Sequence, residues 1–140
     1  AATFRTCILD PPGTGARDAN LPLWRLHRDL LRLRRERGIS ALRREEIDGA
    51  ALGDDLLLLR YRDDLLLLLN LGRDLRGASF AEPLLAPPPN TTWTALFVSE
   101  DPRYGGQGQA PPFASDGLHL PARTCTLLAA TLLPGAAPSC

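Results

Sequence analysis

The sequence predicts a mainly β fold, an antiparallel β-sandwich preceded by one amphipathic α-helix. Leucines first recur at three- and four-residue spacing, which is the pattern of a helix with one apolar face. Short apolar runs bounded by turn residues follow them, as is typical of strands in a sandwich. A chain of 140 residues can bury one ordinary core but not two, so one domain with a flanking element is expected.

The helix is predicted at residues 21–37. Asp18 or Asn20 can cap its amino end, with Pro22 in the first turn. Several arginines precede Gly38, which suits a helix end with a left-handed residue. The apolar stripe consists of Leu23, Leu26, Leu30, Leu31 and Leu33. Because these leucines need a partner surface, we expect a contiguous apolar patch where that surface is missing, with the helix either folded back on the sandwich or paired with a second copy.

Two apolar runs, residues 56–61 and 65–71, each follow an acidic pair, which predicts a β-meander. Leucine favours helix, but one helix across both runs would bury Asp63 and Asp64 among leucines. Further strands are predicted at residues 50–52, 93–99, 118–120 and 125–128. We therefore expect about six or seven strands, beginning near residue 40.

Composition excludes several classes of function. Basic and acidic residues both number 16, so net charge does not favour binding to nucleic acid or to a lipid surface. The cysteines Cys7, Cys125 and Cys140 are far apart, which predicts neither a disulfide framework nor a zinc site and favours the cytoplasm. No apolar stretch reaches the ~18 residues of a membrane span.

The sequence predicts no catalytic residue, metal ligand or cofactor. Its acidic pairs adjoin turn residues, and neighbouring carboxylates on a strand point to opposite faces, so we interpret them as turns. His27 and His119 have no second histidine or cysteine at ligand spacing, and we expect packing or surface roles for both. Trp93 is expected in the core.

An arginine-rich helix leaves an alternative function open, a stand-alone interaction module that binds nucleic acid or an acidic partner. Trp24 would be its stacking residue. Nearby acidic residues dilute the charge, and a solvated helix face explains the same pattern without a ligand. The arginines concerned are Arg25, Arg28, Arg32, Arg34, Arg35, Arg37, Arg43 and Arg44.

One string of residues is more specific. Glu100-Asp101-Pro102-Arg103-Tyr104-Gly105-Gly106, followed by Leu120-Pro121-Ala122-Arg123, resembles the C-terminal domain of maltooligosyltrehalose trehalohydrolases, in the α-amylase clan of glycoside hydrolases. Residues 27–35 resemble the last helix of that family's (β/α)8 barrel, and residues 68–72 resemble its central sandwich strand. The resemblance covers about residues 2 to 130. Pro11 and Val98 depart from it, standing where the family tends to have aromatic residues.

This resemblance implies a parent enzyme that hydrolyses the α-1,4 bond beside a terminal trehalosyl unit and releases trehalose. Its paired carboxyl groups would lie on barrel strands, and we interpret this chain as a non-catalytic accessory region cut from a longer protein. The expected divisions are a connecting segment with the last barrel helix at 1–38, the sandwich at 39–133 and a tail at 134–140.

The resemblance also implies partners. We expect the helix to contact the catalytic barrel through Leu23, Leu26, Leu30 and Leu33. A maltooligosaccharide is a further expected partner, whereas nucleic acid and membrane are not. An aromatic plane beside polar groups suits hydroxylated rings. Trp93, Asp101, Arg103 and Tyr104 fit this description. Because core packing is expected for Trp93, the expected substrate-binding residues are Asp101, Arg103 and Tyr104.

Overall fold

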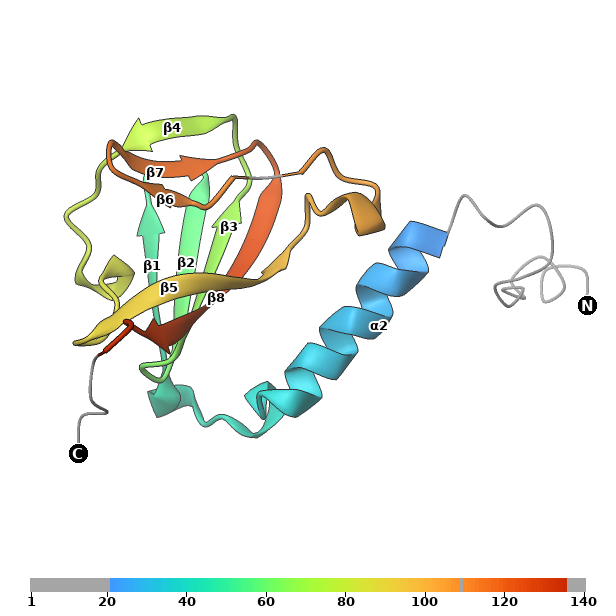
Figure 1. Ribbon diagram of the computed structural model, residues 1–140, viewed down its shortest axis with the longest axis horizontal. Helices are drawn as coiled ribbons and strands as arrows, with labels where there is room; N and C mark the ends of the chain where they lie inside the picture. Colours follow the sequence, from blue (N-terminus) through green and yellow to red (C-terminus); the bar gives the residue numbers. More distant parts are fainter. Residues whose placement is uncertain (1–20, 109, 136–140) are drawn as a thin grey trace, which may run out of the picture.

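The computed structural model describes residues 21–108 and 110–135. Within these ranges one helix, α2 (Leu21–Glu36), precedes eight strands in two antiparallel sheets (Figure 1). The strands are β1 (Ile47–Leu52), β2 (Leu56–Tyr61), β3 (Leu65–Asn70), β4 (Leu75–Ala78), β5 (Thr91–Val98), β6 (Phe113–Ala114), β7 (Gly117–Leu120) and β8 (Thr124–Leu132). The predicted mainly β sandwich with a preceding helix is confirmed.

The helix ends as the sequence predicts. It stops at Glu36, and Gly38 adopts a left-handed conformation with a φ of 63°. A side chain at this φ would be strained, so glycine is the favoured residue here. The predicted capping residues Asp18 and Asn20 lie outside the described residues.

The larger sheet has the strand order β1-β2-β3-β8-β5 and the smaller one β4-β7-β6 within the described ranges. β1, β2 and β3 form the predicted meander, in which Leu56 pairs with Leu52 and Leu65 pairs with Tyr61. The intervening aspartates Asp63 and Asp64 are exposed in the turn, which confirms that they are not buried among leucines.

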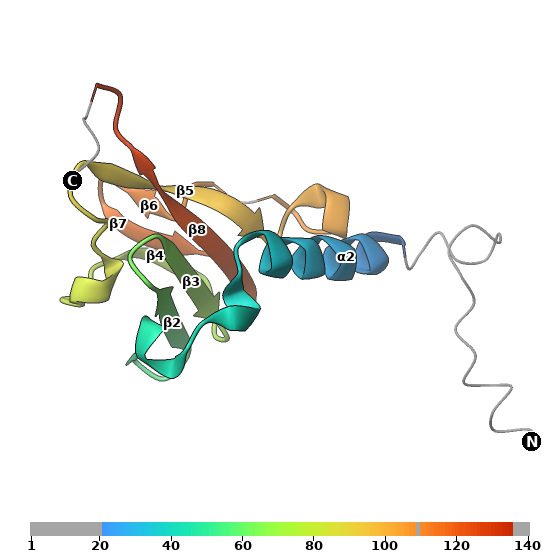
Figure 2. The ribbon, with the colours of Figure 1, turned by 90° about the horizontal axis from the view of Figure 1, so that it is seen from below.

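The pleat gives the larger sheet two apolar faces. One face carries Leu58, Leu66 and Leu128, which are almost fully buried against the smaller sheet. Residues of opposite parity, including Leu65 and Leu127, lie on the other face, where α2 packs (Figure 2). Leucine therefore fills successive positions of β2 and β3, up to Leu59 and Leu69, because both faces of the sheet are covered.

A β-bulge in β5 divides this strand between the two faces. The register with β8 shifts between Ala95 and Phe97. Before the bulge, Trp93 packs against the core between the sheets; after it, Phe97 packs on the helix side. The prediction that Trp93 belongs to the core is confirmed, although its side chain is only partly buried.

The strand count differs from the predicted six or seven because β4 and β6 have no sequence signal. β4 spans only Leu75–Ala78 and contains Gly77, whose φ of 62° interrupts the pairing with β7. β6 has two residues. Neither segment is long enough to show alternation, and the pairing with β7 defines both.

Candidate functional site

Residues 101–105 form a short helical turn, η5 (Pro102–Tyr104), next to the amino-terminal half of α2. The Asp101 carboxylate accepts a hydrogen bond of 2.9 Å from the backbone N–H of Arg103, and Pro102 occupies the first helical position. Gly105 ends the turn in a left-handed conformation, with a φ of 87°. The sequence thus specifies the turn by a capping aspartate, a proline and a glycine.

Tyr104 is the centre of a group of contacting side chains, the η5 cluster. Its members are Asp29, Phe97, Asp101, Arg103 and Tyr104. Its hydroxyl donates a hydrogen bond of 3.0 Å to Oδ2 of Asp29 on α2. Its ring lies 5.7 Å from the ring of Phe97, and the guanidinium of Arg103 stacks 4.6 Å above it. The bond from Tyr104 is the main reason that the pKa of Asp29 is lowered, whereas burial, followed by the same bond, raises the pKa of Tyr104.

The structure therefore brings the three predicted substrate-binding residues together and gives each an internal partner. Arg103 pairs with Asp101 at 3.2 Å, and the Tyr104 hydroxyl is bonded to Asp29. The bond from Tyr104 to Asp29 attaches the sandwich to α2. A role in holding a sugar stays a prediction. Arg103 and Asp101 keep substantial exposure, so both side chains are accessible to a ligand. Asp29 was missed from the sequence, because nothing links it to a tyrosine 75 residues away.

The two glycines after Tyr104 complete the loop. A Cβ on Gly106 would lie 2.3 Å from the backbone carbonyl carbon of Glu100, so only glycine fits. The carbonyl of Glu100 also accepts a hydrogen bond from the backbone N–H of Gly108, at 2.6 Å. Much of the specific string at residues 100–106 thus has a local structural reason.

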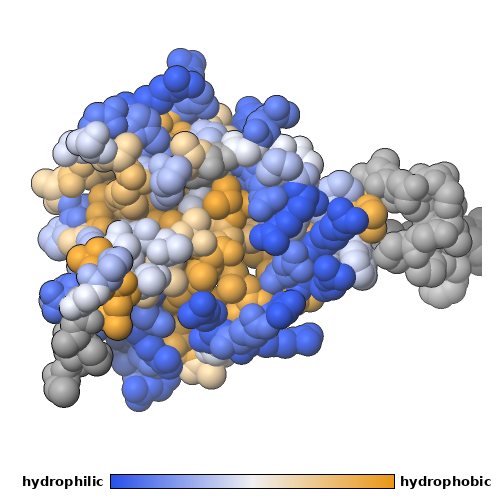
Figure 3. Space-filling view, in the orientation of Figure 1, coloured by the Kyte–Doolittle hydropathy of each residue, from blue (hydrophilic) through white to orange (hydrophobic). Residues whose placement is uncertain are grey.

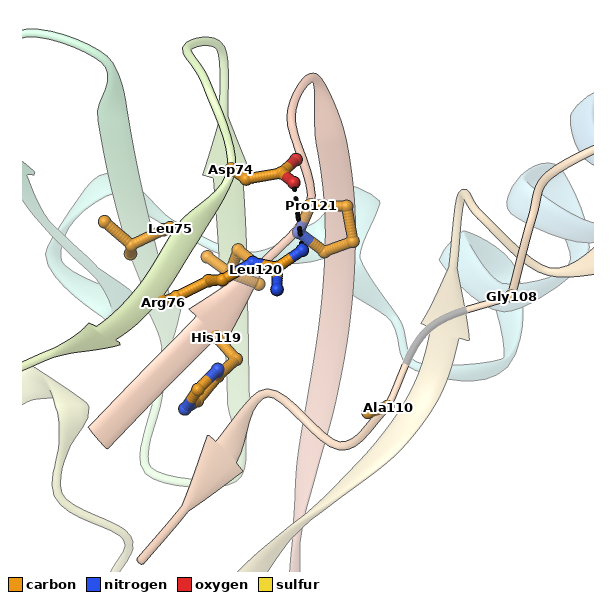
Figure 4. Close-up of a pocket in the computed structure, with 8 residues that line it drawn as sticks. All are labelled: Asp74, Leu75, Arg76, Gly108, Ala110, His119, Leu120 and Pro121. Atoms are coloured by element: carbon orange, nitrogen blue, oxygen red, sulfur yellow. Dashed lines mark hydrogen bonds and ion pairs between the residues drawn. The ribbon is translucent and has the colours of Figure 1, made fainter. Parts of the chain in front are cut away.

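A polar hollow of about 270 Å³ lies on the outside of the smaller sheet (Figure 4). Its lining includes Asp74, Arg76, His119, Gly108 and Ala110. Asp74 accepts a hydrogen bond of 2.9 Å from the backbone N–H of Ala122 and lies 3.5 Å from Arg76. Nε2 of His119 bonds to Asp116 at 2.8 Å. Asp74, Arg76 and His119 thus each have a partner within the domain.

A second cavity, the aromatic groove, lies between β5, β6 and the segment before β5. Its volume is about 260 Å³. Its lining residues are Leu85, Pro87, Thr92, Trp93, Pro111, Pro112 and Phe113. All seven are uncharged, and two are aromatic. Such a lining suits a neutral ligand with an apolar face.

A family model described as "Domain of unknown function (DUF3459)" matches residues 45–127. The chain belongs to this family. DUF3459 is the C-terminal domain found in α-amylase family enzymes, so this is a C-terminal accessory domain of α-amylase-like glycosidases. No curated protein and no solved structure matches the chain.

The DUF3459 match covers both sheets but not α2. It begins within the short turn η3 (Arg44–Glu46) and ends within β8. The η5 cluster, the polar hollow and the aromatic groove therefore lie on residues of the DUF3459 match, apart from Asp29. The helix is attached to this domain by Leu26 and Leu33, which pack on the outer face of the larger sheet.

Four large apolar residues of α2 are exposed. Leu23, Trp24, Leu30 and Leu31 keep 54%, 45%, 39% and 52% of their surface exposed. At ~100° per residue they lie within an arc of about 120° that adjoins the packed side. Figure 3 shows apolar surface between the strands and α2, where a groove of about 240 Å³ is lined by Leu30, Phe97 and Cys125 among others.

The arginines of α2 are partly engaged within the helix. Nε of Arg32 bonds to Glu36 at 2.7 Å, and Arg28 stacks 4.9 Å from the ring of Trp24. The alternative of a nucleic-acid-binding helix stays a hypothesis, which a salt-dependent affinity for duplex DNA would support. In the described ranges no group of three potential ligands could hold a metal ion, and no helix is long and apolar enough to cross a membrane.

Proposed function

We propose that this DUF3459 domain belongs to a glycosidase of the maltooligosyltrehalose trehalohydrolase type and supports its catalytic barrel without taking part in the chemistry. The string at residues 100–106 is the observation that carries the proposal. It resembles that family specifically, and its residues build the η5 cluster that joins the domain to α2.

The chemistry is assigned to the parent enzyme's barrel. Glycoside hydrolysis with retention requires two carboxyl groups about 5 Å apart on a rigid scaffold. The aspartates of the described turns at 53–55 and 62–64 are exposed, and Asp101 caps a backbone turn. We therefore expect this chain by itself to release no trehalose from maltooligosyltrehalose and to leave starch intact.

The supporting role is assigned to α2. Of the four leucines expected at the barrel, Leu26 and Leu33 pack against the sandwich, so the proposed contact falls on Leu23 and Leu30. Trp24 and Leu31 extend the same exposed surface. One side of the helix would then hold the accessory domain and the adjoining side would hold the barrel, with the η5 cluster fixing the angle between them.

The activity is tested on the product of the whole reading frame that contains this chain. We expect trehalose release from maltooligosyltrehalose at a far higher kcat/KM than hydrolysis of starch. The 140-residue chain alone, assayed at the same concentration, is the control. A full-length product that cleaves starch but releases no trehalose would overturn the trehalohydrolase assignment.

The docking surface is tested by placing charge on it in the full-length protein. Replacing Leu23 and Leu31 with glutamate should lower the thermal midpoint, because two carboxylates would be buried against the barrel. Leu71→Glu is the control, since Leu71 is 62% exposed and follows directly after β3. Equal thermal midpoints for the double variant and the control would mean that the barrel does not cover this surface.

A further inference from the structure

The aromatic groove has walls that the fold holds rigid. The buried guanidinium of Arg60 donates hydrogen bonds to the carbonyls of Leu84, at 3.1 Å, and Ala86, at 2.6 Å. Nε1 of Trp93 donates to the carbonyl between them, on Leu85, at 2.8 Å. Three successive carbonyls are thus bound by side chains of β2 and β5, so the segment that forms one wall is fixed in place.

The indole ring of Trp93 is held in one orientation. Its N–H is bonded to Leu85, and the Arg60 guanidinium lies 5.2 Å from its ring centroid. The ring is nevertheless only partly buried, and it lines the aromatic groove together with Phe113. A partly exposed aromatic ring whose rotamer is already fixed loses little entropy on binding, which makes it an efficient contact surface.

We propose that the aromatic groove binds a glucosyl ring of an α-1,4-glucan, an inference that rests on the proposed function. A pyranose ring presents an apolar C–H face, which fits against flat aromatic and proline rings, and a rim of neutral hydroxyls. The groove matches this chemistry because none of its lining side chains is charged. Its volume of about 260 Å³ lies just below the range of sites for drug-sized ligands, which suits one sugar ring.

The polar hollow is a weaker candidate for the same ligand. Asp74, Arg76 and His119 are engaged with neighbours, and no tryptophan, tyrosine or phenylalanine lines the hollow. The aromatic groove instead offers Trp93 and Phe113 from two strands. The function assigned to it is to hold the glucan chain on the accessory domain while another part of the chain occupies the barrel.

The test is a titration of the ¹⁵N-labelled 140-residue chain with maltoheptaose, followed through its two indole N–H signals. The signal of Trp93 should shift and saturate, whereas the signal of Trp24, which lies on α2, should not. Thr92→Glu places a charge at the exposed rim and should weaken binding about tenfold, equivalent to ~1.4 kcal/mol. Thr94→Glu is the matched control, because Thr94 is exposed on the same strand but does not line the groove.

The outcomes separate this inference from the proposed function. An unmoved Trp93 signal, or equal binding by the Thr92→Glu and Thr94→Glu variants, would overturn the glucan site even if the full-length enzyme releases trehalose. Equal shifts with cellohexaose would overturn the assignment to α-linked glucan. Saturable binding of maltoheptaose at Trp93 supports the site, whichever substrate the full-length enzyme then proves to cleave.

Discussion

The hydroxyl of Tyr104 donates a 3.0 Å hydrogen bond to the carboxylate of Asp29, and this bond joins a loop of the sandwich to α2. Tyr104→Phe keeps the ring that packs on Phe97 and removes only the hydroxyl. We expect the free energy of unfolding to fall by about 0.5–1.5 kcal/mol, the usual net value of one hydrogen bond. Amide hydrogen exchange in α2 should also become faster. Tyr61→Phe is the control, and equal changes in both variants would contradict this role.

The loop after η5 should tolerate alanine at one glycine better than at the next. Gly105→Ala introduces strain from its φ of 87°, but the nearest atom to the new Cβ is 3.8 Å away. Gly106→Ala brings a Cβ against the backbone of Glu100 at 2.3 Å, so the loop must move. We expect urea denaturation to show the larger loss of stability for Gly106→Ala, beyond the ~1–2 kcal/mol of left-handed strain. The reverse order would show that the loop is not packed as described.

The two sides of α2 should respond differently to truncation. Leu26 packs on the outer face of the larger sheet, whereas Leu31 is 52% exposed. In the 140-residue chain, Leu26→Ala should cost about 1–2 kcal/mol of the free energy of unfolding, since the side chain is partly buried. Leu31→Ala should stay within about 0.5 kcal/mol. Equal losses would mean that the helix is not seated on the sheet through Leu26.

Glu46 should contribute to the acid sensitivity of the fold. Its carboxylate accepts hydrogen bonds from the backbone N–H of Arg43, at 2.9 Å, and from Nε of Arg62, at 2.7 Å, which lower its pKa from 4.5 to about 2. Because the folded-state pKa is the lower one, this stabilisation is present above about pH 4.5 and is lost as the pH falls towards 2. Glu46→Gln should therefore reduce stability at pH 7 and flatten its decline below pH 4.5.

Urea denaturation at several pH values measures this effect. Glu45→Gln is the adjacent control, since Glu45 is exposed and pairs with the side chain of the exposed Arg43. A decline with pH in the Glu46→Gln variant that is as steep as in the natural chain would contradict the prediction.

Elements with local signals could be predicted from the sequence. β2 and β3 follow from apolar runs between turns, and the end of α2 follows from Gly38. No local sequence signal marks β4, β6 or the bulge in β5, because each is defined by its pairing with another strand. The bulge explains why Trp93 and Phe97 pack on different faces of the sheet. Strict alternation along the strand would place these two residues, four positions apart, on the same face.

The candidate site was predictable to a similar extent. Asp101, Arg103 and Tyr104 stood out as a specific string, and they do form one cluster. The contact from Tyr104 to Asp29 depends on how α2 packs, so no spacing rule reveals it. The aromatic groove was equally hidden, because its residues come from three separate segments that only the tertiary fold brings together.

Cys125 makes the attachment of α2 observable by chemistry. Cys125 lines the same groove as Leu30 and Leu33, and burial raises the pKa of its thiol, so both shielding and protonation slow its reaction with an alkylating reagent. Each departure of the helix from the sheet would remove both protections at once. The labelling rate at Cys125, measured by peptide mass spectrometry, thus reports how often α2 separates from the sheet.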